Sequence, residues 1–106
     1  MTEDHVGAVF AALADPTRRR VVQSLSSGST VTASGLAREL PISRQACAKH
    51  LAALDHAGLV EGERRGRETV YRLTPAPLTE AASWMAAVGE QWDDRLGALR
   101  AHLGRR

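Results

Sequence analysis

The stretch SRQACAKHLAALDHAGLV, residues 43–60, decides how the rest of the chain is interpreted. It begins with polar and cationic residues, continues as an alanine-rich apolar segment and reaches a glycine at Gly58. A helix that turns by about 100° per residue divides residues 44–57 into two sides. One side carries Arg44, Gln45, Ala48, Lys49, Ala52, Asp55 and His56, and the other carries Ala46, Cys47, His50, Leu51, Ala53, Leu54 and Ala57. We therefore expect one side to pack against the protein and the other to be available to a partner.

The available side carries side chains suited to reading the major groove of DNA. Arg44 can donate two hydrogen bonds to a guanine, Gln45 can pair with an adenine or reach a phosphate, and Lys49 adds a mobile positive charge. Ala48 and Ala52 have small side chains, so that the helix can approach the base edges closely. The alternative is an ordinary solvated helix surface that has no partner.

A shorter helix is predicted just before this stretch. Leu36, Ala37 and Leu40 recur at helical spacing after Thr32, a residue type that often caps a helix, and Pro41 ends the segment. Ser43 is suited to cap the helix that follows. Two short helices joined by a tight turn form a helix-turn-helix, here over residues 32–57.

Two more helices are predicted toward the N-terminus. A helix over residues 5–14 is indicated by the helical spacing of Val6, Val9, Phe10 and Leu13. Asp15 and Pro16 suit the start of the next helix, a cap followed by a residue that needs no N–H there. The inward residues of that helix are expected to be Val21, Val22 and Leu25.

Residues 60–73 are predicted to form a β-hairpin with a charged tip. Val60, Val70, Tyr71 and Leu73 flank the sequence ERRGRE, in which Gly66 provides the bend between Arg64, Arg65 and Arg67. Three arginines at a tip repel one another and do not help folding, whereas a phosphate backbone or a narrow minor groove would attract them. The alternative is a merely soluble turn, partly neutralised by Glu63 and Glu68.

The last predicted helix covers residues 78–103 and completes a fold that is mainly α with one small hairpin. Its apolar residues, mostly three or four positions apart, are Leu78, Met85, Val88, Trp92, Leu96, Leu99 and Leu103. Counting this segment, the chain is expected to contain about five helices and a two-stranded hairpin.

Length and composition limit the remaining possibilities. The 106 residues suffice for one domain with a modest core, so we expect a single domain over residues 1–106. One cysteine allows no intrachain disulfide, which agrees with a reducing cytoplasm. The sequence has no apolar run of about 18 residues and no secretory signal, so we expect no membrane contact. It also lacks a glycine-rich phosphate loop and a nucleophile motif, so we do not expect an enzyme.

The charge distribution indicates a polyanionic partner for the middle of the chain. Residues 15–72 contain ten Lys or Arg and six Asp or Glu, a net charge of +4. The remaining residues contain four and six, a net charge of −2. A basic middle between acidic ends favours a nucleic acid as the partner.

Two long motifs resemble the ArsR/SmtB family of winged helix-turn-helix transcriptional repressors. They are ALADPTRRRVVQSL and LARELPISRQACAKHLAALDHAGLVEGERRGRETVYRL, which together cover most of residues 5–74. The resemblance implies a DNA-reading helix over residues 43–57, a wing formed by the hairpin, and a homodimer held by the first and last helices. It implies repression at a palindromic operator in double-stranded DNA. By position, Ser43, Arg44, Gln45 and Lys49 would contact DNA, and Arg64, Arg65 and Arg67 would brace its backbone.

The effector is where the sequence departs from this family. Arsenic, cadmium and lead sensors of the family carry paired cysteines in or near the third helix, and TASGLAREL, residues 32–40, contains none. Zinc and nickel sensors carry Asp, His and Glu at a fixed spacing that Asp93, Asp94 and His102 do not follow. We expect no metal and no cofactor, and any small-molecule effector is unknown. The alternatives are a metal- or redox-responsive repressor, and a winged-helix module that binds protein instead of DNA.

Cys47 lies on the packed side of the reading helix. A buried cysteine normally acts as a small hydrophobic residue, so we assign it to the core. The competing interpretation is a redox switch, because oxidation there would displace the reading helix. His50 is expected to be a hydrogen-bonded structural residue, and Trp84 and Trp92 fit a dimer contact more simply than a ligand pocket.

Overall fold

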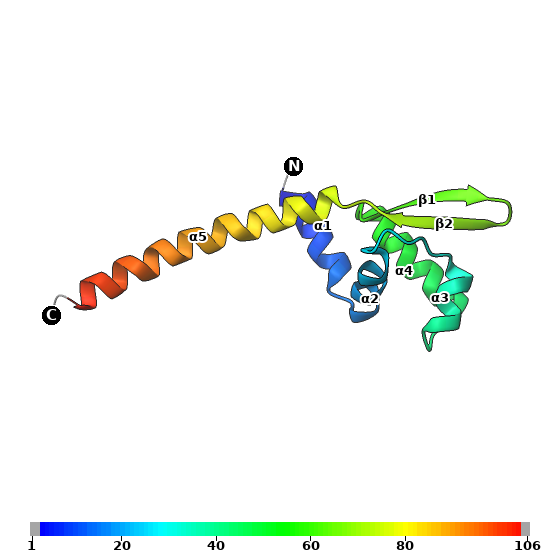
Figure 1. The fold of residues 1–106 in the computed structure, drawn as a ribbon, viewed down its shortest axis with the longest axis horizontal. Coiled ribbons are helices and arrows are strands. Elements are labelled where there is room, and N and C mark those ends of the chain that lie inside the picture. Colours follow the sequence, from blue (N-terminus) through cyan, green and yellow to red (C-terminus); the bar gives the residue numbers. More distant parts are fainter. Residues whose placement is uncertain (1–2, 105–106) are drawn as a thin grey trace.

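The computed structural model describes residues 3–104 and shows five helices and one two-stranded hairpin in that range (Figure 1). The elements are α1 (Glu3–Leu13), α2 (Pro16–Leu25), α3 (Ala33–Glu39), α4 (Arg44–His56), β1 (Val60–Arg65), β2 (Glu68–Leu73) and α5 (Ala76–Gly104). The predicted fold class, mainly α with a winged helix-turn-helix arrangement, is confirmed. Helix α5 starts earlier than predicted and includes Pro77 in its first turn, where a missing N–H is tolerated.

The three predicted capping residues begin their helices. The Asp15 carboxylate accepts hydrogen bonds from two backbone N–H groups in the first turn of α2, at 2.8 and 3.1 Å. The hydroxyl groups of Thr32 and Ser43 each accept one such bond, at 3.0 Å in α3 and 3.1 Å in α4. Each cap satisfies N–H groups that have no partner inside the helix, and so fixes where the helix starts.

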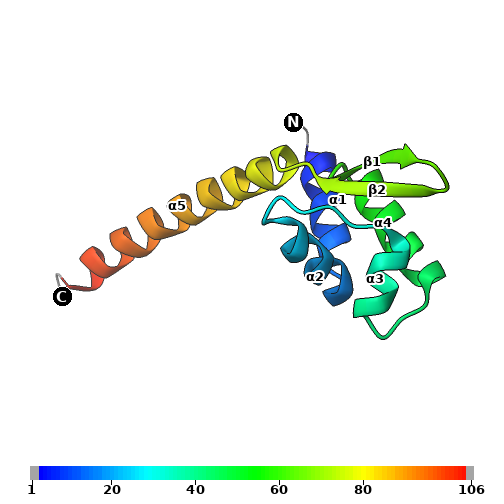
Figure 2. The same cartoon turned by 45° about the vertical axis from the view of Figure 1, so that its right-hand side comes forward.

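The core lies where α1, α2 and α4 meet the base of the hairpin (Figure 2). The inward residues predicted for α2, Val21, Val22 and Leu25, are buried. The most completely buried side chains of the described residues are Leu25, Leu51, Leu54, Leu59, Val9, Val21 and Cys47. This small aliphatic core holds the helix-turn-helix and the hairpin as one body.

Phe10 lies at the edge of the core, although it shares the helical spacing of Val9. It is 37% exposed, whereas Val9 and Ala12 are buried. Its ring packs edge-on against Trp84 of α5, with the ring centroids 5.8 Å apart. Helical spacing locates the apolar side of α1, but it does not show that α5 packs beside this side at Phe10.

The hairpin is antiparallel and pairs Val60 with Leu73 at its base and Arg65 with Glu68 at its tip. Gly66 has a φ of 62°, the left-handed conformation, and is the first of two connecting residues. A positive φ at that position alone matches a type II′ turn, which favours glycine there. An unpredicted bridge joins Val31, between α2 and α3, to Tyr71 of β2 through two backbone hydrogen bonds of 2.8 and 3.1 Å.

Helix α5 begins beside α1 and then projects away from the rest of the protein (Figures 1 and 2). The molecule therefore measures 70 × 29 × 22 Å. Ala81 is the one buried residue of this helix within the described range. The apolar side chains predicted for this helix are instead exposed over much of its length, and they include Met85, Trp92, Leu99 and Leu103 at 50–58%.

Candidate DNA-binding surface

The two sides predicted for α4 are present in the structure. Arg44, Gln45 and Lys49 are exposed, and Ala48 and Ala52 on the same side of the helix are exposed as well. On the opposite side, Cys47, Leu51 and Leu54 are buried. The N-terminal part of α4 thus presents a cationic and amide-bearing surface that no other segment of residues 3–104 covers.

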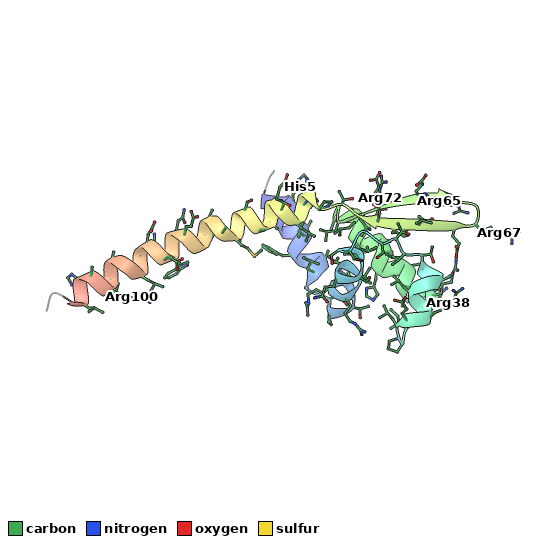
Figure 3. All side chains as sticks on the ribbon, viewed as in Figure 1. His5, Arg38, Arg65, Arg67, Arg72 and Arg100 are labelled. Carbon is green, nitrogen blue, oxygen red and sulfur yellow. The ribbon has the colours of Figure 1, made fainter. Side chains whose placement is uncertain are left out.

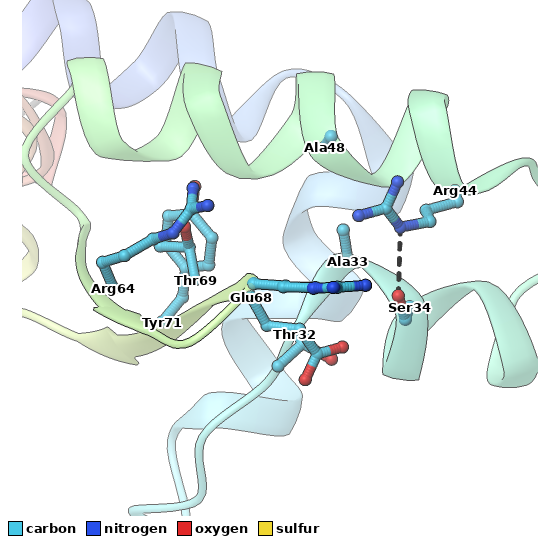
Figure 4. Close-up of a pocket in the computed structure, with 10 residues that line it drawn as sticks. Thr32, Ala33, Ser34, Arg44, Ala48, Arg64, Glu68, Thr69 and Tyr71 are labelled. Atoms are coloured by element: carbon cyan, nitrogen blue, oxygen red, sulfur yellow. Dashed lines mark hydrogen bonds between the residues drawn. The ribbon is translucent and has the colours of Figure 1, made fainter.

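A hydrogen bond to the neighbouring helix α3 holds the guanidinium group of Arg44. Its Nε donates a 3.0 Å hydrogen bond to Oγ of Ser34, the second residue of α3 (Figure 4). This contact could not be predicted from sequence, because Ser34 lies ten residues before Arg44 and belongs to no motif. The guanidinium group is nevertheless exposed, and its two terminal nitrogens point away from Ser34 (Figure 4).

A hollow of about 160 Å³ separates α4 from the hairpin (Figure 4). It is lined by residues of α3, α4 and both strands, which are Thr32, Ala33, Ser34, Arg44, Ala48, Arg64, Arg67, Glu68, Thr69 and Tyr71. Three guanidinium groups and one carboxylate leave this lining with an excess of positive charge. A hollow of this volume is large enough to hold several water molecules.

The hairpin places its arginines on different faces. Arg64 lies on the face that lines the hollow, and its Nε donates a 3.0 Å hydrogen bond to the Gly66 carbonyl oxygen. Arg65 follows it in the strand, points to the opposite face and pairs with Glu63 at 3.4 Å. Arg67, at the tip of the hairpin (Figure 3), also lines the hollow. The period of two in a strand, which separates Arg64 from Arg65, could have been used to predict this difference.

An interaction between Arg18 and His50 supports α4 from its packed side. Arg18 Nε donates a 3.3 Å hydrogen bond to His50 Nδ1, and its Nη1 donates another, also 3.3 Å, to the carbonyl oxygen of Ala12. His50 is therefore the hydrogen-bonded structural histidine that was predicted. The hydrogen bond from the backbone N–H of Arg18 lowers the pKa of Asp15, and the nearby His50 and Arg18 side chains act in the same direction.

Three other features bear on function: the Cys47 thiol, groups that could bind a metal ion, and helices that could cross a membrane. The Cys47 side chain is 1% exposed, in agreement with a core position. Within residues 3–104, no group of three or more His, Cys, Asp or Glu side chains is placed to hold a metal ion. No helix of the described range has the length and the apolar character that crossing a membrane requires.

Known proteins with a similar chain share this architecture. A helix-turn-helix domain model matches residues 13–63. An ArsR-like transcriptional regulator from Rhodococcus sp. RHA1 is 44% identical, with a TM-score of 0.79 over 92% of this chain and 91% of that one. The transcriptional repressor SdpR of Bacillus subtilis (strain 168) is 34% identical over 77 residues, which are 73% of this chain and 84% of SdpR. The chain belongs to the ArsR/SmtB family. It is a DNA-binding transcriptional regulator of that family and not an enzyme.

A further solved structure with a similar fold is a homodimer. The homodimeric winged helix-turn-helix DNA-binding domain of Mb0332 from Mycobacterium bovis, described as a possible ArsR-family regulator, is 25% identical. Its TM-score is 0.65, over 82% of this chain and 81% of that one. Within the ArsR/SmtB family, the hairpin β1–β2 corresponds to the wing, and we use that name below.

Proposed function

We propose that this protein is a homodimeric repressor that binds a palindromic operator in double-stranded DNA. Its whole chain, residues 1–106, acts as one winged-helix domain, with the helix-turn-helix at 32–57 and the wing at 60–73. The observation that carries the proposal is the uncovered surface of α4, where Arg44, Gln45 and Lys49 are exposed beside a wing rich in arginine. Because its partner is DNA, we place its activity in the cytoplasm.

In this proposal α4 lies in the major groove and the wing follows the adjacent backbone. Arg44 and Gln45 read base edges from the first turn of α4, where helix-turn-helix proteins make such contacts. Ser43, at the start of that turn, and Lys49, one turn further along, bind phosphates. The excess positive charge of the hollow supports this arrangement, because phosphate contacts provide most of the affinity for DNA and also fix the orientation of the reading helix.

Arg64, Arg65 and Arg67 brace the backbone unequally. Arg64 and Arg67 line the hollow beside α4, so they face the same duplex as Arg44. Arg65 points to the other face of the wing, where the carboxylate of Glu63 competes with a phosphate for its guanidinium group. We therefore expect Arg65 to contribute less to the affinity for DNA than Arg64 or Arg67.

The homodimer forms through the first and last helices, at 5–14 and 78–103 in the predicted boundaries. Met85, Val88, Trp92, Leu96 and Leu99 lie within an arc of about 80° on α5, at 100° per residue, and Leu103 continues the series. Several of these residues are eleven apart, a spacing that keeps an apolar stripe on one side of a nearly straight helix. An uncovered stripe of this kind suits burial against a second copy.

The apolar stripe continues onto α1. Val6, Gly7, Phe10 and Trp84 line an open hollow between α1 and α5, and Phe10 and Trp84 are 37% and 44% exposed. A partner subunit that covered the stripe would also cover these two aromatic rings. The homodimeric state of the M. bovis relative supports this mode of assembly.

Selection of bound sequences from a random DNA pool tests the proposal directly. We expect an enriched palindrome whose half-sites lie one helical turn apart, or a multiple of that distance. Arg44→Ala should relax the preference at one base pair of each half-site, at a cost of about 1–3 kcal/mol. A pool that shows no enrichment would contradict DNA reading and would favour a module that binds protein instead.

A further inference from the structure

A hydrogen bond within the DNA-binding surface singles out a residue that has no role in the preceding assignment. Arg44 Nε donates to Ser34 Oγ at 3.0 Å, which links α4 to α3 (Figure 4). We propose that Ser34 is a specificity-determining residue, which acts by positioning the guanidinium group of Arg44 for base reading. The inference rests on the proposed function and deepens it.

The chemistry of the guanidinium group explains what this contact achieves. The group has five N–H donors in a planar fork, and Ser34 takes the one on Nε. The four donors on the two terminal nitrogens stay available to a ligand. These are the donors with which an arginine makes two parallel hydrogen bonds to O6 and N7 of a guanine. The contact therefore orients the plane of the Arg44 fork without using the edge that would read the base.

Both ends of the contact are attached to fixed points of the backbone. Ser34 lies in the first turn of α3, which Thr32 caps, and Arg44 is the first residue of α4, which Ser43 caps. Helices α3 and α4 already pack together, so neither helix has to move for the two side chains to meet. Arg44 is thus held in place before DNA arrives, and less of its side-chain freedom is lost on binding.

A direct contact between Ser34 and a phosphate is the competing explanation. The Ser34 hydroxyl also lines the hollow with Arg64 and Arg67, and it can donate its own hydrogen to an anion there. A phosphate contact would raise the affinity for every DNA sequence and would not need Arg44. A positioning role would act at one base pair and would disappear when Arg44 is removed. The two roles therefore differ in a double-mutant cycle.

The experiment uses the full chain and the duplex selected from the random pool, together with a duplex changed at the base pair that Arg44→Ala relaxes. Binding of the wild type, Ser34→Ala, Arg44→Ala and the double variant is measured by fluorescence anisotropy. We expect Ser34→Ala to weaken binding to the selected duplex about 3- to 10-fold, the cost of immobilising a long side chain that is no longer held. It should have little effect on the changed duplex, and none in the Arg44→Ala background.

Two further variants serve as controls. Ser34→Thr keeps a hydroxyl group at the same position and should restore most of the affinity. Ser27→Ala removes an exposed serine from the turn after α2, away from α3 and α4, and should bind like the wild type. Alanine is a better helix former than serine, so Ser34→Ala should fold, which thermal unfolding will show.

Two results would overturn the inference while the proposed function stands. These are an unchanged affinity of Ser34→Ala, or an equal loss with and without the Arg44 side chain, which indicates a direct phosphate contact. A pool without enrichment would instead overturn the proposed function, and this inference with it. The selection step thus separates the failure of one from the failure of the other.

Discussion

The two faces of the wing predict different effects for two adjacent arginines. Arg64 faces the hollow beside α4, whereas Arg65 points to the opposite face and pairs with Glu63. Arg64→Ala and Arg65→Ala remove the same charge from neighbouring positions of one strand, so each variant is the control for the other. We expect Arg64→Ala to weaken binding to cognate and random DNA alike, because it removes a phosphate contact.

The magnitude follows from counterion release. Each phosphate contact contributes about 0.9 to the slope of log affinity against log salt, so Arg64→Ala, which acts twice in a dimer, should reduce the slope by about 1.8. Between about 50 and about 200 mM salt, the advantage of the wild type over this variant should therefore shrink by about 12-fold. For Arg65→Ala we expect less than half of that change in slope, because Glu63 already holds the guanidinium group.

The assay is fluorescence anisotropy with the selected duplex and a random duplex across this range of salt. Thermal unfolding of both variants should match the wild type, since exposed side chains at a hairpin tip contribute little to stability. Equal changes in slope for the two variants, or a larger change for Arg65→Ala, would refute the argument that the hollow side of the wing faces the duplex.

Three other predictions concern the dimer, the thiol and the cap. Trp92→Ala should weaken dimerisation, by up to about 3 kcal/mol per protomer if a ring of about 200 Å² that is 58% exposed becomes buried. Sedimentation over a range of concentrations measures this, and Glu90→Ala, on the side of the same helix away from the stripe, should leave dimerisation unchanged. Peroxide should not release DNA from the wild type, because the Cys47 thiol is 1% exposed; release from the wild type but not from Cys47→Ala would establish a thiol switch. The lowered pKa of Asp15 stabilises the fold above the ordinary value of 3.8, and this contribution is lost as the pH falls through the lowered value. Thermal melts should therefore show that Asp15→Ala costs stability at neutral pH and costs less in strong acid; an equal loss at both would contradict the linkage.

The features that could be predicted from sequence are those set by interactions between near neighbours in the chain. A capping residue satisfies N–H groups two or three positions ahead, so Asp15, Thr32 and Ser43 could be identified from local sequence. The two sides of α4 follow from helical periodicity over fourteen residues. The left-handed conformation of Gly66 follows from the turn that a short hairpin requires.

The features that could not be predicted depend on contacts between distant segments. The hydrogen bond from Arg18 spans 32 positions to His50, and that from Arg44 spans ten positions back to Ser34. Each depends on the packing of two helices, and the identity of a serine carries no sign of it. Phe10 shows the same limit in the core, because its exposure was decided by where α5 lies. The candidate site was thus predictable as a surface, whereas the contacts that orient its side chains were not.

The composition of α5 makes sense when the stripe is considered together with the reading helix. In the monomer, Trp92, Leu96 and Leu99 are 39–58% exposed. They form an apolar surface that is in contact with water and does not pack against the core of the same chain. Burying that stripe against a second copy would stabilise the assembly and fix the distance and angle between two α4 helices. An operator with two half-sites then gains the second set of contacts at a high effective concentration, without any new interaction in either subunit. In the proposed homodimer, the stripe on α5 and the cationic surface of α4 would therefore act together: burial of the stripe would set the geometry of the two α4 helices, and the charge of α4 would supply affinity for DNA.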